Sequence, residues 1–185
     1  MHDVTTPSTI DSFLANTEKR AFRMALLATK DKSESLDIVQ DSMMKLVEYY
    51  SDRDASDWGP LFHKILQNNI IKWYRQQRRK KRWFWQAPPN DDEDSEFIVQ
   101  VESPEWEIPD AIWERSEKVD AVVNAVEQLA IRQQQAFLLR CWEGYDTSTT
   151  AEIMECSEGS VKTHYFRALQ NLRALLDDQE LRDVG

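Results

Sequence analysis

The sequence predicts an all-α protein of two small helical domains joined by an acidic linker, with a helix-turn-helix in the C-terminal domain. The chain has 185 residues, of which 41% are hydrophobic, enough for one ordinary domain or two small ones. It contains only four glycines and six prolines, and β-branched residues never alternate over a long run. Apolar residues instead recur three and four positions apart, which is the spacing of amphipathic helices.

The first 50 residues are expected to form two helices, over residues 10–29 and 35–50. The second has an apolar stripe that should pack inward, namely Leu36, Val39, Met43, Leu46 and Tyr50. Its opposite side carries Asp37, Gln40, Asp41, Met44 and Glu48. That side is either a solvated acidic face or a docking face for a basic partner helix, and the pattern alone favours the solvated face.

A polar loop is expected over residues 51–60. Gly59 and Pro60 stand at its end and should break any helix. Trp58 precedes them, and its ring either covers the core below or faces a ligand.

A third helix is expected over residues 61–82. Its inward residues are Phe62, Ile65, Leu66, Ile70 and Trp73. A second stripe without any acid holds Lys64, Asn68, Lys72, Arg75 and Arg79, and the helix ends in the cations of residues 78–82. Aromatic rings among cations are typical of proteins that hold single-stranded nucleic acid, because bases stack on the rings while cations bind phosphates. The alternative is a basic patch for an acidic protein or for the chain's own linker.

The charge of the chain is distributed very unevenly. The formal net charge is −10, yet residues 1–82 hold 15 Lys and Arg against 11 Asp and Glu. Residues 83–120 hold two basic residues against 12 acidic ones. The first segment is therefore basic despite the acidic total, and it is the local charge that a phosphate backbone meets. The acidic segment is either a solvated spacer or a strand that occupies a basic channel meant for nucleic acid.

Helix is expected to resume at Trp113. The next apolar stripe is Val119, Val122, Val123, Val126 and Leu129. A further helix over residues 131–142 should turn Ala136, Phe137 and Leu139 inward. Gly144 then ends that helix by supplying a left-handed cap.

Residues 146–176 have the pattern of a helix-turn-helix. A short helix over residues 147–154, capped by Asp146 or Thr149, leads to a turn at residues 155–157, and Ser157 can cap a second, longer helix. The apolar stripe of that helix is Val161, Tyr165, Ala168, Leu172 and Leu175. Its other face carries Lys162, Thr163, Phe166 and Arg167, which suits a helix in the DNA major groove. The alternative is a plain amphipathic helix pair in a bundle.

Several classes of site are not indicated. Cys141 and Cys156 form no metal-binding pattern and are expected to be buried structural residues. Acids and histidines do not converge at a spacing typical of catalysis, so we expect no catalytic residue, metal or cofactor. No signal peptide or membrane-length apolar run is found, so we expect a cytoplasmic protein.

Three motifs together carry a resemblance to a known family. They are Asp-Ile-Val-Gln-Asp at residues 37–41, Leu-Phe-His-Lys-Ile-Leu-Gln-Asn at residues 61–68, and Cys-Ser-Glu-Gly-Ser-Val-Lys-Thr at residues 156–163 with Arg167 and Ala168. In this order, over residues 10–176, the chain resembles a bacterial RNA polymerase sigma factor of the extracytoplasmic-function (ECF) type.

That resemblance implies three parts. A region 2 domain over residues 1–85 would bind the core polymerase and recognise and melt the −10 promoter element. A linker over residues 86–112 would run toward the active site and the RNA exit path. A region 4 domain over residues 113–185 would dock on the β flap and read the −35 element. An anti-sigma factor is a further partner to consider, and the free protein would be a monomer.

The resemblance also implies roles for individual residues. Contact with the β′ clamp of the core polymerase would be made by Asp37, Gln40, Asp41 and Met44. The −10 element, duplex and melted, would be held by Trp58, Asn68, Lys72, Trp73, Arg75, Arg78 and Arg79. The −35 element would be read by Lys162, Thr163, His164, Phe166 and Arg167.

Other functions remain as alternatives. A stand-alone helix-turn-helix regulator would bind duplex DNA as a dimer without polymerase. A nuclease or nucleotide hydrolase would need a metal or acid–base cluster, which the spacing does not indicate. An adaptor or anti-sigma protein would bind polymerase without starting transcription.

Overall fold

The computed structural model describes residues 9–85 and 117–183, and within these ranges every regular element is a helix. The N-terminal helices are α1 (Ile10–Thr29), α2 (Lys32–Tyr50) and α3 (Ala55–Trp85). The C-terminal helices are α4 (Glu117–Glu127), α5 (Ile131–Phe137), α6 (Thr147–Met154) and α7 (Glu158–Asp183), with a π-helical turn, η1 (Leu138–Trp142), directly after α5. The predicted all-α class is confirmed. The predicted linker and the helix start at Trp113 lie outside the described residues.

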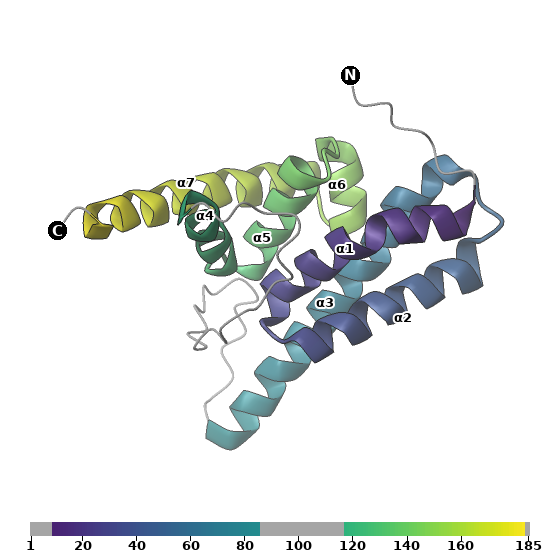
Figure 1. Ribbon diagram of the computed structural model, residues 1–185, viewed down its shortest axis with the longest axis horizontal. Coiled ribbons are helices and arrows are strands. Elements are labelled where there is room, and N and C mark those ends of the chain that lie inside the picture. The colour runs from purple at the N-terminus through teal and green to yellow at the C-terminus, as the bar shows by residue number, and fades with distance from the viewer. Residues whose placement is uncertain (1–8, 86–116, 184–185) are drawn as a thin grey trace.

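Helices α1, α2 and α3 pack side by side, and the C-terminal helices lie against them (Figure 1). Helix α6 packs on α3, while α5 and α4 both pack along the long helix α7. The two halves of the described chain are therefore in direct contact.

The first helix has the predicted bounds, and the second begins earlier than predicted. Thr9 caps α1 by accepting a hydrogen bond from the Ser12 amide. Asp31 caps α2, because its Oδ1 accepts a hydrogen bond of 2.9 Å from the Glu34 amide. This cap starts α2 at Lys32 rather than at the expected Ser35.

The prediction that Gly59 and Pro60 end a loop was wrong. Helix α3 begins at Ala55 and runs through both residues. Trp58 anchors the first turn of α3. Its side chain is buried with 6% of its surface exposed, and its Nε1 donates a hydrogen bond to the Tyr50 carbonyl. The ring of Phe13 packs beside this indole. A tertiary anchor thus overrides the local breaker signal.

The inward face of α2 differs from the predicted stripe. Leu36 is 50% exposed, whereas Ser35 and Ser42 are fully buried beside Ile38, Val39 and Leu46. The two serine hydroxyls are satisfied: Ser35 Oγ lies 2.7 Å from Thr29 Oγ1, and Ser42 Oγ accepts a bond of 2.8 Å from Asn69. Partnered hydroxyls can occupy a core position at little cost, so apolar periodicity alone chose the wrong residue.

The core crosses both halves of the described chain. Its larger cluster joins Met24, Leu46, Phe62, Leu66 and Ile70 to residues of the C-terminal half, namely Ala125, Val126, Leu129, Leu138, Ala168 and Leu172. A smaller cluster lies wholly within the C-terminal helices and consists of Ala136, Leu139, Ala151, Ile153, Met154 and Val161. The smaller cluster holds α6 and α7 together.

The C-terminal helices follow the prediction with two exceptions. Val126 and Leu129 are buried as predicted, but Val122 and Val123 are exposed and Ala125 is buried in their place. Cys141 is exposed and Cys156 is half-buried, whereas both were expected to be buried. The inward direction of Ala136 and Leu139 is confirmed, and Gly144 has the predicted left-handed conformation, with φ +74°.

No helix among the described residues is long and apolar enough to cross a membrane. In the same residues, no group of three or more His, Cys, Asp or Glu side chains could hold a metal ion.

Candidate nucleic-acid interface

The helix-turn-helix forms with the predicted boundaries of its first helix and turn. Asp146 is the cap of α6, since its Oδ1 accepts a hydrogen bond of 2.7 Å from the Thr149 amide, and the same bond lowers the pKa of Asp146. Glu155 adopts a left-handed conformation with φ +53° and ends α6. Ser157 then accepts a bond of 3.1 Å from the Ser160 amide at the start of α7. Of the two predicted caps for α6, the structure selects Asp146.

Helix α7 has an inner and an outer face. On the inner face Val161, Ala168 and Leu172 are buried, and Tyr165 is partly buried. Tyr165 is held from one side by Arg140, whose guanidinium lies 5.8 Å from the ring centroid, and by Cys141, whose sulfur lies 3.3 Å from the hydroxyl. These contacts fix the rotation of α7 about its axis.

The outer face of α7 presents the predicted DNA-reading side chains. Lys162, Thr163, Phe166 and Arg167 are all exposed, and Phe166 exposes 60% of its surface. Thr163 Oγ1 donates a hydrogen bond of 3.0 Å to the Gly159 carbonyl. His164, the fifth predicted residue, is half-buried. Major-groove recognition needs hydrogen-bond donors and an apolar group. Lys162 and Arg167 supply the donors, and the exposed ring of Phe166 supplies the apolar group.

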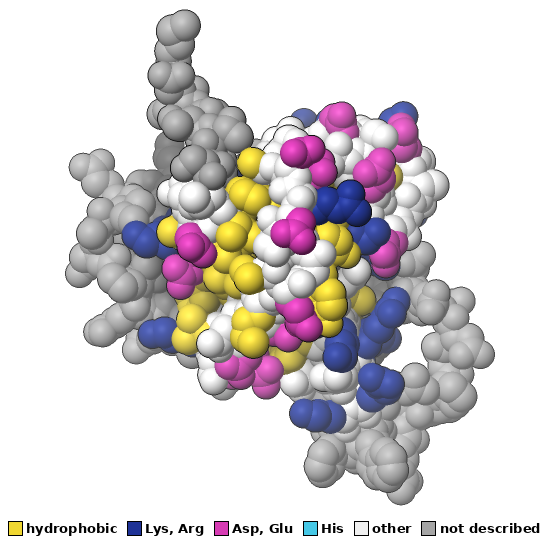
Figure 2. Space-filling model, turned by 90° about the vertical axis from the view of Figure 1, so that its right-hand side faces the viewer, with side chains coloured by type: hydrophobic (Ala, Val, Ile, Leu, Met, Phe, Trp, Pro, Cys, Tyr) yellow, Lys and Arg dark blue, Asp and Glu magenta, His cyan; other side chains and the backbone are white. Residues whose placement is uncertain are grey.

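The basic stripe of α3 also lies on the surface. Asn68, Lys72, Arg75 and Arg79 are exposed, and Arg78 is half-buried. In Figure 2, Lys and Arg side chains gather toward the bottom of the molecule, where Figure 1 shows the C-terminal end of α3. Lys64, at the other end of the stripe, forms an ion pair of 3.2 Å with Glu155 in the helix-turn-helix. Over the described side chains, the stripe is therefore exposed along its C-terminal part and forms an ion pair at its N-terminal end.

The two tryptophans predicted to contact the −10 element differ in position. Trp58 is part of the core and does not present its ring at the surface, so its predicted place in a base pocket is corrected to a structural role. Its burial follows from the early start of α3, which points the indole between α1 and α2. Trp73 is half-buried and packs against the same core.

The acidic side of α2 is exposed along its length. This side consists of Asp37, Gln40, Asp41, Met44 and Glu48, all of which lie on the surface, and Met44 exposes 65% of its surface. Among the acids, Asp41 pairs with Lys45 at 2.7 Å. Leu36, which was predicted to face inward, is exposed here. Together with the exposed Val47 and Tyr49 it adds apolar area to this side of the molecule. Acidic and apolar groups on one exposed helix are typical of a protein-docking surface rather than of a purely solvated one.

Several buried polar residues were not singled out from the sequence. Gln133, Gln134 and Gln135 are all buried, although three consecutive glutamines resemble a surface segment. Each makes a specific bond: Gln133 accepts from Asn171, Gln134 donates to the Leu27 carbonyl, and Gln135 donates to Gln67. Because the three glutamines are consecutive, they show no helical periodicity that could have predicted their burial.

The chain is similar to several known proteins. Residues 120–172 match the family model described as sigma-70, region 4. Over most of its length the chain is similar to the ECF RNA polymerase sigma factor SigX of Bacillus subtilis, with 24% identity across 88% of this chain and 81% of the relative. It is also 25% identical to the RNA polymerase sigma factor SigV of the same organism, across 96% of both chains.

A solved structure has the same fold. It is the co-crystal structure of the sigma factor RpoE in complex with the anti-sigma factor NepR from Bartonella quintana. The TM-score is 0.61 at 20% identity, and the match covers 90% of this chain and 96% of the solved one. The fold therefore matches across both the N-terminal and the C-terminal helices.

Proposed function

This chain is an RNA polymerase sigma factor of the ECF type, and we propose which of its surfaces carries each step of transcription initiation. Sigma factors are non-catalytic subunits that bind core RNA polymerase and direct it to promoters. The polymerase supplies the chemistry, while this chain supplies core binding, sequence readout and strand opening.

The exposed side of α2 is the proposed contact with the β′ clamp. Asp37, Gln40, Asp41 and Met44 form this contact, and Leu36 extends it with an apolar side chain. Support comes from their common exposure on one helix whose other side packs against α1 and α3. A basic partner helix would pair with the carboxylates and cover the apolar groups.

The outer face of α7 is the proposed reader of the −35 element. Lys162 and Arg167 can donate to base edges or phosphates, and Phe166 can meet a thymine methyl group. The single observation that carries this assignment is the exposure of these three side chains on a helix whose opposite face is locked into a core.

The basic stripe of α3 is the proposed contact with the −10 element. Its members are Asn68, Lys72, Arg75, Arg78 and Arg79. Phosphate contacts by the cations would position the strand, and Asn68 can pair with a base edge. Trp73, partly exposed in the middle of the stripe, stays a predicted stacking residue.

The domain limits at residues 1–85, 86–112 and 113–185 belong to the same proposal, as does docking of the region 4 domain on the β flap. We also propose a monomer in the free state, action in the cytoplasm where the polymerase works, and control by an anti-sigma factor. The last point is supported by the fold match to a sigma factor solved with such a partner.

The experiment is transcription by purified core polymerase, with and without this protein, on a pool of promoter fragments from the source organism. Discrete new start sites with a shared −35 and −10 pair are expected. Binding to core without new starts would point to an adaptor, and DNA binding without core binding would point to a stand-alone regulator. Base substitutions in the shared elements then assign each element to α7 or α3 through variants of those helices.

A further inference from the structure

Lys45 lies where the proposed core-binding side of α2 meets α3, the helix that carries the basic stripe. Its Nζ is 2.7 Å from Asp41 Oδ2 on α2 and 3.2 Å from Asn69 Oδ1 on α3. Asp41 belongs to the proposed contact with the β′ clamp, whereas Asn69 directly follows Asn68 of the basic stripe. The ammonium group of Lys45 therefore connects the two proposed surfaces.

Asn69 is held in a fixed orientation toward Lys45. Ser42 donates its only hydroxyl hydrogen to the Ile38 carbonyl at 2.7 Å, so its oxygen can only accept a further bond. The bond of 2.8 Å between Ser42 and Asn69 must then come from the amide Nδ2, which leaves Oδ1 for Lys45. Because Ser42 is fully buried, this anchor does not depend on what binds at the surface. Lys45 thus has a fixed neutral acceptor on α3 besides the carboxylate on α2.

The position of Asn69 brings the Lys45 ammonium to the edge of the basic stripe. Residues three positions apart on a helix are neighbours on its surface, so Lys72 lies beside Asn69. Lys72 is exposed, and the side chain of Lys45 is 38% exposed. A DNA strand bound along α3 would therefore pass within reach of Lys45.

Asp41 cancels the attraction of Lys45 for phosphate. Its carboxylate is in direct contact with the ammonium group, and its side chain is 53% exposed. An ammonium paired with a carboxylate offers a DNA strand almost no net charge, so it adds nothing to the release of counterions from that strand. The pair spans one helical turn at the surface, and such pairs contribute little to stability. Asp41 can therefore exchange Lys45 for another cation at small cost.

Core binding would use the same carboxylate. A basic residue of the clamp that pairs with Asp41 brings a second cation next to Lys45, and like charges repel. Lys45 then keeps its acceptor on Asn69. We infer that Asp41 serves two partners in turn: it neutralises Lys45 in the free protein, and its capture by core polymerase releases Lys45 to bind a phosphate of the opened −10 strand. This inference rests on the proposed function.

The first experiment frees Lys45 without polymerase. The full-length chain is titrated with a labelled single-stranded oligothymidylate at several salt concentrations. Asp41→Asn removes the competing charge, so we expect binding to tighten about two- to fivefold, the range given by an exposed ion pair. The slope of log K against log salt should steepen by about 0.7, which is the contribution of one further phosphate contact on a single strand.

Asp37→Asn is the matched control, because it removes the same charge from the same exposed side one turn before Asp41. Its salt slope should equal that of the parent. Adding Lys45→Gln to Asp41→Asn should abolish the gain, whereas Lys45→Arg should keep it, since arginine also binds phosphate. Equal slopes in the parent and Asp41→Asn, undetectable binding by Asp41→Asn, or a gain that survives Lys45→Gln would each overturn the inference.

The second experiment uses the complex with core polymerase. Lys45→Gln should bind core at least as tightly as the parent does, because Asp41 loses its internal competitor. The complex should nevertheless bind the same oligonucleotide with a slope shallower by about 0.7. A residue with a purely structural role would lower both affinities together and leave the slope unchanged. Lys19→Gln, at an exposed lysine of α1, should change neither quantity.

The two experiments separate this inference from the proposed function. If core polymerase does not bind the chain, the proposed function fails, and the titrations of the free chain still decide whether Asp41 masks Lys45. If core polymerase binds and new start sites appear while Lys45→Gln leaves the slope of the complex unchanged, the proposed function stands and the inference is overturned.

Discussion

The Trp58 indole donates a hydrogen bond of 3.2 Å to the Tyr50 carbonyl, which ties the first turn of α3 to the last turn of α2. The ring itself is buried against Phe13. A tryptophan that looked suited to a ligand is therefore part of the support for the helix that carries the basic stripe. The distinction between support and contact can be measured.

Trp58→Phe should lower stability and leave promoter opening at a given folded concentration unchanged. The change removes the pyrrole part of the buried indole and its N–H hydrogen bond while keeping an aromatic ring, so we expect a loss of about 1–3 kcal/mol in the free energy of unfolding. Urea unfolding and a strand-opening assay on the same preparation check this. A normal stability with defective opening would restore Trp58 to the DNA surface.

Arg167→Ala should weaken transcription from promoters that depend on the −35 element, by about 1–3 kcal/mol in the affinity for that element. Its exposed guanidinium lies on the outer face of α7, away from the core. Competition between promoters with intact and mutated −35 elements measures the effect. Arg173→Ala, an exposed arginine on the same helix, is the matched control. An equal loss of core binding would contradict the assignment of this face.

Asp41→Ala should reduce affinity for core polymerase while DNA binding by the outer face of α7 is retained. The ion pair with Lys45 is exposed and spans one helical turn, so its loss should cost folding only about 0.3–0.5 kcal/mol. Titration of labelled protein with core polymerase provides the measurement, with Asp52→Ala in the exposed loop after α2 as the control. Unchanged core affinity would remove Asp41 from the proposed contact.

Acidification should destabilise the protein through His63. Burial lowers the pKa of His63 to about 4, and the Arg20 charge acts in the same direction. The unfolded chain takes up the proton near the ordinary value of 6.5, so this contribution is complete above that pH and is lost as pH falls toward 4. Between pH 7 and pH 5 the loss is about 2 kcal/mol.

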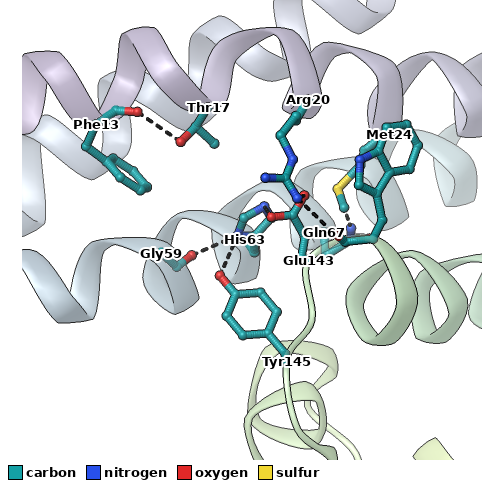
Figure 3. Close-up of polar contacts among 10 residues, drawn as sticks. Phe13, Thr17, Arg20, Met24, Gly59, His63, Gln67, Glu143 and Tyr145 are labelled. Carbon is teal, nitrogen blue, oxygen red and sulfur yellow. Dashed lines mark hydrogen bonds and ion pairs between the residues drawn. The ribbon is translucent and has the colours of Figure 1, made fainter. Parts of the chain in front are cut away.

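Other titratable groups face His63 (Figure 3) and also change stability with pH. The contribution of His63 is therefore measured as a difference in the free energy of unfolding between the parent and a variant that lacks the histidine. Burial raises the pKa of Glu143, so this carboxyl acts in the opposite direction in acid, and burial also raises the pKa of Tyr145 above the range tested. Urea unfolding of the parent and of His63→Gln at pH 7, 6 and 5 isolates the histidine. The advantage of the parent should shrink as pH falls, and parallel curves would refute the prediction.

Local pattern alone was enough for much of the fold. The bounds of α1 and α6, the left-handed Gly144 and the inward face of α7 all followed from spacing and caps that involve neighbouring residues. The outer face of α7 followed as well, because a helix with one apolar stripe must turn its other side to solvent. The all-α class and the resemblance to ECF sigma factors rested on the same short-range signals.

Other features were decided by contacts between distant segments. Ser35 is buried and Leu36 exposed because Thr29 supplies a partner for the serine hydroxyl. Tyr145 contacts His63 because the fold brings together two segments that are 82 positions apart in the sequence. No residue next to either of them in the sequence indicates this contact. Periodicity reports which side of a helix is apolar, whereas the pairing of buried polar groups depends on which helices meet. That choice is made by the whole packed chain, so only the tertiary structure decided it.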